Sequence, residues 1–349
     1  MTHAMIITSP QHDPWYNLAL ENFLMDLLGR QPDLQAVLYL WQNENTVVIG
    51  RNQNAWAECL TGQLEAEGGR LARRSTGGGA VFHDLGNLNF SLIFPRRSFH
   101  LDNNFDMIVD AVSRLGIQAE RTGRNDITAG GLKFSGNAFS LRRLVGLHHG
   151  TLLIHSEYAR VARYLTVNPA KLQAKGVASV RSRITNLQAI NPDITVAAMA
   201  KAMEESFIAH FCMTPADETG NPVTVVYATD VQFAQDASFI ALNEHYASWE
   251  WRYGETIKFD ALIEEKLDWG MLHLGFQIDH GRVSRATLYS DALDSDFISL
   301  LADALIGCRF RSPDLADALR RLTDLDGGFG TPRQQMVDDL TRLVLEQNW

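Results

Sequence analysis

The segment from Arg73 to Asp84 constrains the fold most, because two arginines and three consecutive glycines are followed at once by apolar residues. Glycine reaches backbone conformations that other residues avoid and lets a ligand approach the main chain. Arginine carries a permanent, planar charge suited to phosphate or carboxylate. The pattern over 70–94 therefore predicts strand, glycine turn and strand, with an anion near the turn. A flexible hairpin beside surface arginines is the alternative, which the return to Val81 and Phe82 disfavours.

The rest of the chain has the composition of a globular protein with more than one domain. Its 349 residues are 46% hydrophobic and 21% charged, a length and composition typical of a large folded core. The net charge of −10 argues against broad binding to nucleic acid or an anionic membrane. No apolar run approaches the roughly 20 residues of a membrane-spanning helix, and no signal-peptide pattern is seen. We expect a cytoplasmic protein with neither nucleic-acid nor membrane partners.

Cysteine usage gives no sign of a disulfide framework or a zinc site. The three cysteines, at positions 59, 212 and 308, are far apart, and no CxxC spacing occurs. None lies near the glycine segment or near Lys133, which weakens a covalent acyl-enzyme mechanism. The glycines match neither the GxxxxGK[ST] pattern nor the GxGxxG pattern of nucleotide-binding loops.

Apolar periodicity predicts a mixture of helices and strands. Asp13 and Pro14 favour a helix start, and Gly29 favours its end. Strands are expected at 37–41 and 46–50, joined by a turn, at 87–92 and 150–154, and in succession over 118–154. Helices are expected at 55–67, 102–115, 157–165, 195–211 and 231–247.

The aromatic-rich segment Trp249–Trp251 is a candidate domain junction. A strand pair at about 267–278 and 282–289 follows it, and then helices near 294–306, 313–323 and 332–347. These elements predict a small α+β domain. We therefore predict a catalytic domain over 1–248, a linker over 249–260 and an accessory domain over 261–349.

Lys133, Asp126 and the pair His148–His149 are the remaining candidates for chemistry. A lysine can bridge a carboxylate and the phosphate that activates it, although a lone lysine is usually a solvated strand-edge residue. Asp126 offers an oxygen ligand for Mg²⁺, or it is a turn residue after Asn125. Adjacent histidines on a strand point to opposite faces, so structural histidines, one of them lining a pocket, fit better than a metal site.

The basic segment 172–186, which is rich in small residues, has two interpretations, and its residues favour both equally. It is either a mobile lid over an anionic intermediate or a solvated loop.

Together these segments resemble the lipoate–protein ligase A family over nearly the whole chain. The resemblance is carried by 13–19, 46–51, 73–87, 123–126, 133–136, 148–153, 175–186, the 249–251 junction and the C-terminal tail. It implies an α/β (α+β) catalytic domain of the biotin/lipoate–protein ligase type, with a mixed β-sheet flanked by helices. A small α+β accessory domain follows it.

The resemblance also implies two half-reactions. Lipoate and Mg-ATP give lipoyl-AMP and pyrophosphate, and a lysine of a lipoyl carrier domain then takes the lipoyl group and releases AMP. The implied carriers are the E2 subunits of 2-oxoacid dehydrogenases and the glycine cleavage H protein. We expect the enzyme itself to be a monomer.

Site residues follow from the same resemblance. Lys133 is the implied catalytic residue and contacts both ATP and lipoate, with Trp41 and His149 also at the lipoate. Asp126 is the implied Mg²⁺ contact. The implied ATP or adenylate contacts are Arg74, Gly79, Ala80, Val81, Phe82, Lys133 and Lys175.

One position departs from the family pattern. Ser140 stands where a ligase of this family has an arginine thought to assist the transfer step, and Arg142 or Arg143 could substitute for it.

Two other functions stay open. The first is an ATP-independent octanoyl or lipoyl transferase, which the 175–186 segment and the C-terminal tail disfavour. The second is a noncatalytic lipoate or adenylate sensor, which Arg74, Asp126 and Lys133 disfavour.

Overall fold

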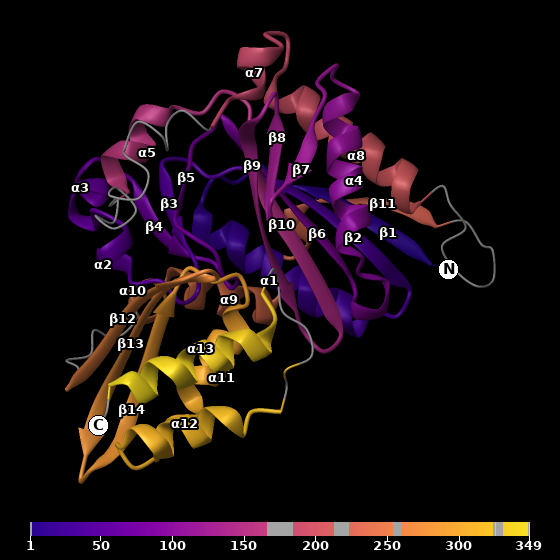
Figure 1. Ribbon diagram of the computed structural model, residues 1–349. Helices are drawn as coiled ribbons and strands as arrows, with labels where there is room; N and C mark the ends of the chain where they lie inside the picture. The colour runs from indigo at the N-terminus through magenta and orange to yellow at the C-terminus, as the bar shows by residue number, and fades with distance from the viewer. Residues whose placement is uncertain are drawn as a thin grey trace.

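The structure is a computed structural model that describes residues 2–165, 184–212, 223–253, 260–323, 325, 331–347 and 349. Figure 1 shows a large sheet flanked by helices and, beside it, a smaller orange and yellow part that contains the C-terminus. The large part is a mixed α/β domain and the smaller part is a C-terminal domain with a small sheet and helices. Both features confirm the predicted fold class.

The large sheet has eight strands, with β1 parallel to both its neighbours and antiparallel pairing from β2 to β7. In spatial order its strands are β11 (Thr224–Ala228), β1 (His3–Thr8), β2 (Leu34–Trp41), β6 (Asn87–Pro95), β10 (Val145–Leu153), β9 (Leu132–Leu141), β8 (Asp126–Ala129) and β7 (Glu120–Thr122).

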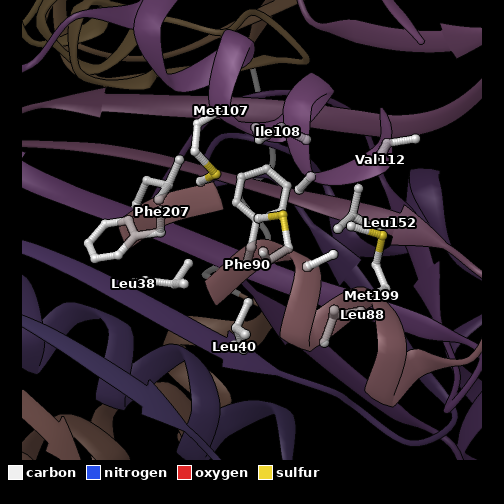
Figure 2. Packing of buried hydrophobic residues seen from close by; sticks show 14 of the residues in the cluster. Leu38, Leu40, Leu88, Phe90, Met107, Ile108, Val112, Leu152, Met199 and Phe207 are labelled. Atoms are coloured by element: carbon white, nitrogen blue, oxygen red, sulfur yellow. The ribbon is translucent and has the colours of Figure 1, made fainter. Parts of the chain in front are cut away.

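Helices cover both faces of this sheet (Figure 1). On one face, α4 (Leu101–Ser113) and α8 (Val196–Phe211) pack over alternate residues of the central strands. Figure 2 shows this core, in which Phe90 lies among methionine, leucine and phenylalanine side chains from the sheet and both helices. On the other face lie α1 (Pro14–Arg30) and α9 (Ala237–Ala247). Central strands therefore bury both of their faces.

The first helix begins and ends where the sequence predicts, within one residue. The Asp13 side chain accepts hydrogen bonds from the backbone N–H groups of Trp15 and Tyr16, which satisfies donors that a helix start leaves free. Pro14 occupies the first turn, where its missing N–H costs nothing. This cap fixes the start of α1, the helix that carries Leu18 and Glu21 toward the candidate site.

A second sheet holds the glycine segment. It has three strands in the order β4 (Arg70–Arg73), β3 (Thr46–Ile49) and β5 (Val81–His83). The turn after β2 thus leads into a different sheet instead of closing a hairpin. The helix expected over 55–67 is two short helices, α2 (Ala55–Glu58) and α3 (Thr61–Ala66).

Short elements complete the catalytic part. They are η1 (Arg96–Ser98), α5 (Tyr158–Tyr164), α7 (Leu187–Ile190), η2 (Asp230–Gln232) and α10 (Trp249–Tyr253). Helix α10 lies within the predicted linker and is tied to β4, because Arg73 Nε donates to the Trp251 carbonyl at 2.8 Å. The proposed domain boundaries remain a prediction.

The C-terminal domain has its own apolar core. An antiparallel sheet of β12 (Ala261–Leu267), β13 (Gly270–Asp279) and β14 (Arg282–Ser290) packs against α11 (Ser295–Asp303), α12 (Ser312–Arg320) and α13 (Arg333–Glu346). The sequence predicted only two of these strands. β12 was missed because it is an edge strand with charged, exposed positions, which is how natural sheets protect their edges. Among the described helices, none combines the length and apolar character needed to cross a membrane.

Candidate active site

A cavity of about 190 Å³ lies between the large sheet, helix α1 and the glycine segment. Its lining residues come from stretches far apart in sequence. They are Leu18, Trp41, Val48, Arg74, Gly78, Gly79, Ala80, Val81, His83, Asn89, Asn125, Lys133, Gly136, Asn137, Ala138, His149, Gly150 and Thr151.

Two rows of residues run across the strands β9, β10, β6 and β2 on the cavity side of the sheet, and all of them except Ser91 and Tyr39 line the floor of the cavity. Strand register and one hydrogen bond, from Gly136 N–H to Thr151 Oγ1, define both rows. The first row is Gly136, Thr151, Asn89 and Trp41. The second row is Ala138, His149, Ser91 and Tyr39.

The roof is the glycine segment, in which the three glycines meet different requirements. Gly78 adopts a φ of 91°, which favours glycine. A Cβ on Gly77 would lie 2.1 Å from the Ala292 carbonyl oxygen of the C-terminal domain. Gly79 has no described protein atom within 4 Å of where its Cβ would be. It lines the cavity, so its lack of a side chain leaves space for a ligand.

Arg74 holds the glycine segment in its conformation. Its Nη2 donates to the carbonyls of Gly77 at 2.7 Å and Gly79 at 2.8 Å, and its Nε donates to Thr76 Oγ1 at 3.1 Å. The side chain is buried, which lowers its pKa to about 10. Within the described part of the chain, its hydrogen bonds go to carbonyl and hydroxyl oxygens. The charge is therefore not neutralised by a bonded carboxylate and favours an anionic ligand.

A buried relay connects the roof, the floor and helix α1. Thr76 Oγ1 lies 2.8 Å from His149 Nε2, and His149 Nδ1 lies 2.8 Å from Glu21 Oε2. Because the carboxylate only accepts, His149 donates from Nδ1; in the neutral form of the ring, Thr76 then donates to Nε2. Ser91 also donates to Glu21 Oε2, at 2.5 Å. The geometry is that of a nucleophile–base–acid triad, but Thr76 is fully buried and does not line the cavity. We therefore interpret the relay as positioning the roof.

Lys133 stands at the edge of the floor. Its Nζ lies 2.7 Å from Asp126 Oδ1, and both side chains are about one-third exposed. The ammonium group also lies beside Gly136, 3.2 Å from the place of a Cβ there. A partly exposed cation at the rim of a partly apolar cavity can meet the charged end of a ligand whose chain lies inside.

Most of the predicted site residues converge. Arg74, Gly79, Ala80, Val81, Lys133, Trp41 and His149 all line the cavity. Phe82 does not: its ring packs on Tyr164, with centroids 5.6 Å apart, in the core of the small sheet. Alternation along β5 turns it away, so only its backbone could reach a ligand. Lys175 lies outside the described residues.

The arginines near Ser140 do not reach the cavity. Arg142 binds helix α1, through Asn22 Oδ1 and, at 3.3 Å, Asp26 Oδ1. Neither Arg142 nor Arg143 lines the cavity.

Three residues at or behind the cavity wall were not predicted from the sequence: Glu21, Thr76 and Asn89. Glu21 carried a signal, since a carboxylate within an apolar run of a buried helix needs a buried partner. Asn89 and Ser91 alternate with apolar residues on β6; both are buried, and Asn89 lines the cavity.

The described residues contain no group of three or more His, Cys, Asp or Glu side chains that could hold a metal. Mg²⁺ needs less, because it binds through one or two carboxylates together with substrate phosphates. Asp126, partly exposed beside the rim lysine, fits that role as a single carboxylate.

Comparison with known proteins identifies the class. Residues 13–208, more than half of the chain, match the family model of the lipoyl protein ligase A/B catalytic domain. Residues 256–343 match that of the bacterial lipoate protein ligase C-terminus. The chain is thus an enzyme of the lipoate ligase and transferase class. It belongs to the lipoate–protein ligase A family, in its two-domain form.

Solved structures agree with this assignment. LipL1 of P. falciparum in complex with lipoate is 29% identical, with a TM-score of 0.83 over 98% of this chain and 99% of that chain. A bipartite lipoate protein ligase of Thermoplasma acidophilum, solved with its E2 lipoyl domain, is 23% identical, with a TM-score of 0.59 over 74% and 99%. A lipoate-protein ligase A bound with ATP is 23% identical, with a TM-score of 0.57 over 73% and 99%. The last two show the fold.

Proposed function

We propose that this protein is an ATP-dependent lipoate–protein ligase. The observation that carries the proposal is the position of Lys133, at the rim of a cavity that also contains the glycine segment and buried Arg74. A carboxylate inside the cavity and a phosphate at its roof would meet at this lysine. Lipoate has a carboxylate and an apolar chain that suit such a site.

In the first half-reaction, a lipoate carboxylate oxygen attacks the α-phosphorus of ATP. The new P–O bond forms as the bond to pyrophosphate breaks, giving lipoyl-AMP. Both reactants are anions, and Lys133 lowers their repulsion and stabilises the charge of the transition state. Gly79 leaves the backbone open to the phosphate, and Asp126 would hold the Mg²⁺ that neutralises phosphate charge.

In the second half-reaction, a neutral lysine amine of a lipoyl carrier attacks the acyl carbon. The C–N bond forms, the bond to AMP breaks, and the amine loses a proton to water. Lipoyl domains of 2-oxoacid dehydrogenase E2 subunits and the glycine cleavage H protein are the proposed acceptors. The enzyme itself needs no nucleophile, and we propose that it acts as a monomer in the cytoplasm.

A transferase that works through an acyl-cysteine has less support. None of the three cysteines lines the cavity, and burial raises the pKa of the Cys59 thiol to about 12 and that of Cys212 to about 11. A thiol with a raised pKa is a poor nucleophile at neutral pH.

The test measures lipoate-dependent pyrophosphate release from Mg-ATP and then the mass of an added lipoyl carrier domain. Release together with a lipoyl mass increase supports the ligase. Carrier acylation from an octanoyl carrier without ATP would support the transferase instead, and tight lipoate binding without any product would support the sensor.

A further inference from the structure

Two buried side chains of the cavity wall, Asn89 and His83, retain a polar atom without a hydrogen bond to any described residue. The atoms are Asn89 Nδ2 and His83 Nε2. Asn89 is 1% exposed and His83 is 3% exposed, and both residues line the cavity. Buried polar groups in native proteins are nearly always paired, and an unpaired one is costly. A ligand of the cavity is a source of the missing partner.

The neighbour of Asn89 determines which of its atoms is free. Asn87 Nδ2 donates to Asn89 Oδ1 at 2.9 Å. With the amides in this orientation, Asn89 Oδ1 is engaged and the Asn89 amino group is left as a donor; Asn87 Oδ1 is likewise unpaired among the described residues.

The proton on His83 follows from a chain of hydrogen bonds. Asn17 Nδ2 donates to the Gln42 carbonyl at 2.9 Å and to Asn43 Oδ1 at 3.0 Å. Asn43 thus directs its amino group at His83 Nδ1, 3.2 Å away, which must accept. The ring proton of neutral His83 is then on Nε2. Burial, together with the charge of Arg74, lowers the pKa of His83 to about 3, so the ring is neutral.

Both donors lie near Trp41, at the end of the first row opposite Lys133. Trp41 pairs with Asn89 across β2 and β6, and its ring centroid is 6.2 Å from that of His83. Its own Nε1 donates to Ser91 at 3.1 Å, so Trp41 offers the cavity only an apolar ring. With strands about 4.8 Å apart, Trp41 is roughly 14 Å from Gly136 across the sheet. A ligand whose carboxylate meets Lys133 therefore places its far end near these donors.

We propose that Asn89 and His83 select acyl chains whose far end accepts a hydrogen bond, namely the dithiolane ring of lipoate, over purely hydrocarbon chains. This inference rests on the proposed function, because Lys133 must hold the carboxylate. Sulfur is a weak acceptor, but a hydrocarbon end leaves both donors unpaired. Sites with buried donors discriminate against analogues in this way. Octanoate and the carbocyclic analogue of lipoate, with methylenes in place of both sulfurs, are then poor substrates.

The experiment is a competition between lipoate and its carbocyclic analogue, with Mg-ATP and a lipoyl carrier domain, read as the mass ratio of the two acylated carriers. The analogue retains the ring, so the ratio reports the sulfurs and not the size of the end group. We expect the wild-type protein to prefer lipoate roughly tenfold. Asn89→Leu, which removes the donor and keeps the volume, should bring the ratio close to one. Asn89→Ala makes the same comparison if the leucine variant does not fold.

Thr151→Val is the matched control, because it removes a polar group of the same row whose Oγ1 is already paired with Gly136 N–H. It should lower the overall rate without changing the ratio. Equal ratios in the wild-type protein and both Asn89 variants would overturn the inference and leave the ligase function intact. A wild-type protein that acylates no carrier with either acid would overturn the proposed function and the inference with it.

Discussion

Lys133 is the residue on which the proposed chemistry depends most. Its ammonium group is ion-paired with Asp126 yet partly exposed, so it is free to exchange that partner for substrate anions. We predict that Lys133→Ala lowers the rate of pyrophosphate release by about 10² to 10³, the usual effect of removing one preorganised charge from a transition state. Steady-state assays of pyrophosphate would measure it.

The matched control is Lys201→Ala, since Lys201 also pairs with a carboxylate, Glu205 at 3.8 Å, on the exposed side of α8. It should retain full activity. Near-normal pyrophosphate release by Lys133→Ala, with the fold verified by circular dichroism, would remove Lys133 from the mechanism.

Gly79 tests whether the roof must stay open. A Cβ there meets no described protein atom within 4 Å, so Gly79→Ala should fold with unchanged stability while its methyl group occupies ligand space. We predict at least roughly tenfold weaker ATP binding in calorimetry, equivalent to about 1.4 kcal/mol. Gly62→Ala, at an equally open position on helix α3, should bind ATP normally. Equal affinities for the two variants would show that the ligand does not approach Gly79.

Among the elements, the glycine segment depends on Arg74 and the neighbouring strand end depends on Arg73. Both side chains are buried and donate to backbone carbonyls. Arg74 donates to the carbonyls of Gly77 and Gly79, whereas Arg73 donates to carbonyls within 50–53 and α10. Replacing either by alanine leaves buried acceptors unpaired and should cost at least about 2 kcal/mol of unfolding free energy. Only Arg74→Ala should also abolish ATP binding. Denaturant titration and calorimetry on the folded variants would separate the two effects; similar ATP affinities would mean that Arg74 has no special role at the ligand.

Local patterns in the sequence predicted the elements better than the site. The capped start of α1 was predicted from Asp13 and Pro14, and alternation identified β6 as a strand. The sequence did not show that the polar face of β6 is also buried, because that depends on the glycine segment folding over it. Alternation of polar and apolar residues shows that a strand has two different faces, but it does not show which part of the protein covers each face.

The relay from Glu21 to His149 and Thr76 shows why the rest of the site was not predictable. Its hydrogen bonds join residues 128 and 73 positions apart. Each of these residues has an ordinary local context, and only the packing of α1 and the small sheet on β10 brings them together. Long-range pairing of single polar residues leaves no periodic signal, whereas the glycine segment was conspicuous because its composition is unusual.

For the whole molecule, buried neutral histidines make stability depend on pH. The pKa of folded His83 is about 3, and that of His148 is also lowered by burial, whereas unfolded histidine titrates near 6.5. Below about pH 6.5 the unfolded chain therefore binds more protons, so the free energy of unfolding falls as pH falls. We predict a loss of about 1.4 kcal/mol per pH unit from His83 between roughly pH 6 and 4. Urea titrations at several pH values would give the free energy of unfolding as a function of pH. The slope of that free energy against pH should be shallower for His83→Gln than for the wild-type protein. It should be unchanged for His280→Gln, whose side chain is 94% exposed.

Contacts between the domains give the last prediction. A methyl group on Gly77 would overlap the Ala292 carbonyl at 2.1 Å, so Gly77→Ala should push the C-terminal domain off the roof. Small-angle X-ray scattering should show a larger radius of gyration than for the wild-type protein, with Gly62→Ala as the unchanged reference. A scattering curve identical to that of the wild-type protein would indicate that the glycine segment moves instead of the C-terminal domain.

The Gly78 N–H group of the roof donates to the Ala292 carbonyl at 3.0 Å, so a ligand that took this amide would couple occupancy of the site to the arrangement of the domains. A phosphate that takes this amide as its donor must displace Ala292. Nucleotide binding and domain docking then share one coupling free energy, and reciprocity is obligatory. The factor by which docking weakens the nucleotide equals the factor by which the nucleotide weakens docking. Nucleotide affinity can be measured before and after the chain is cut between the domains. The change in affinity would then give the strength with which the nucleotide separates them.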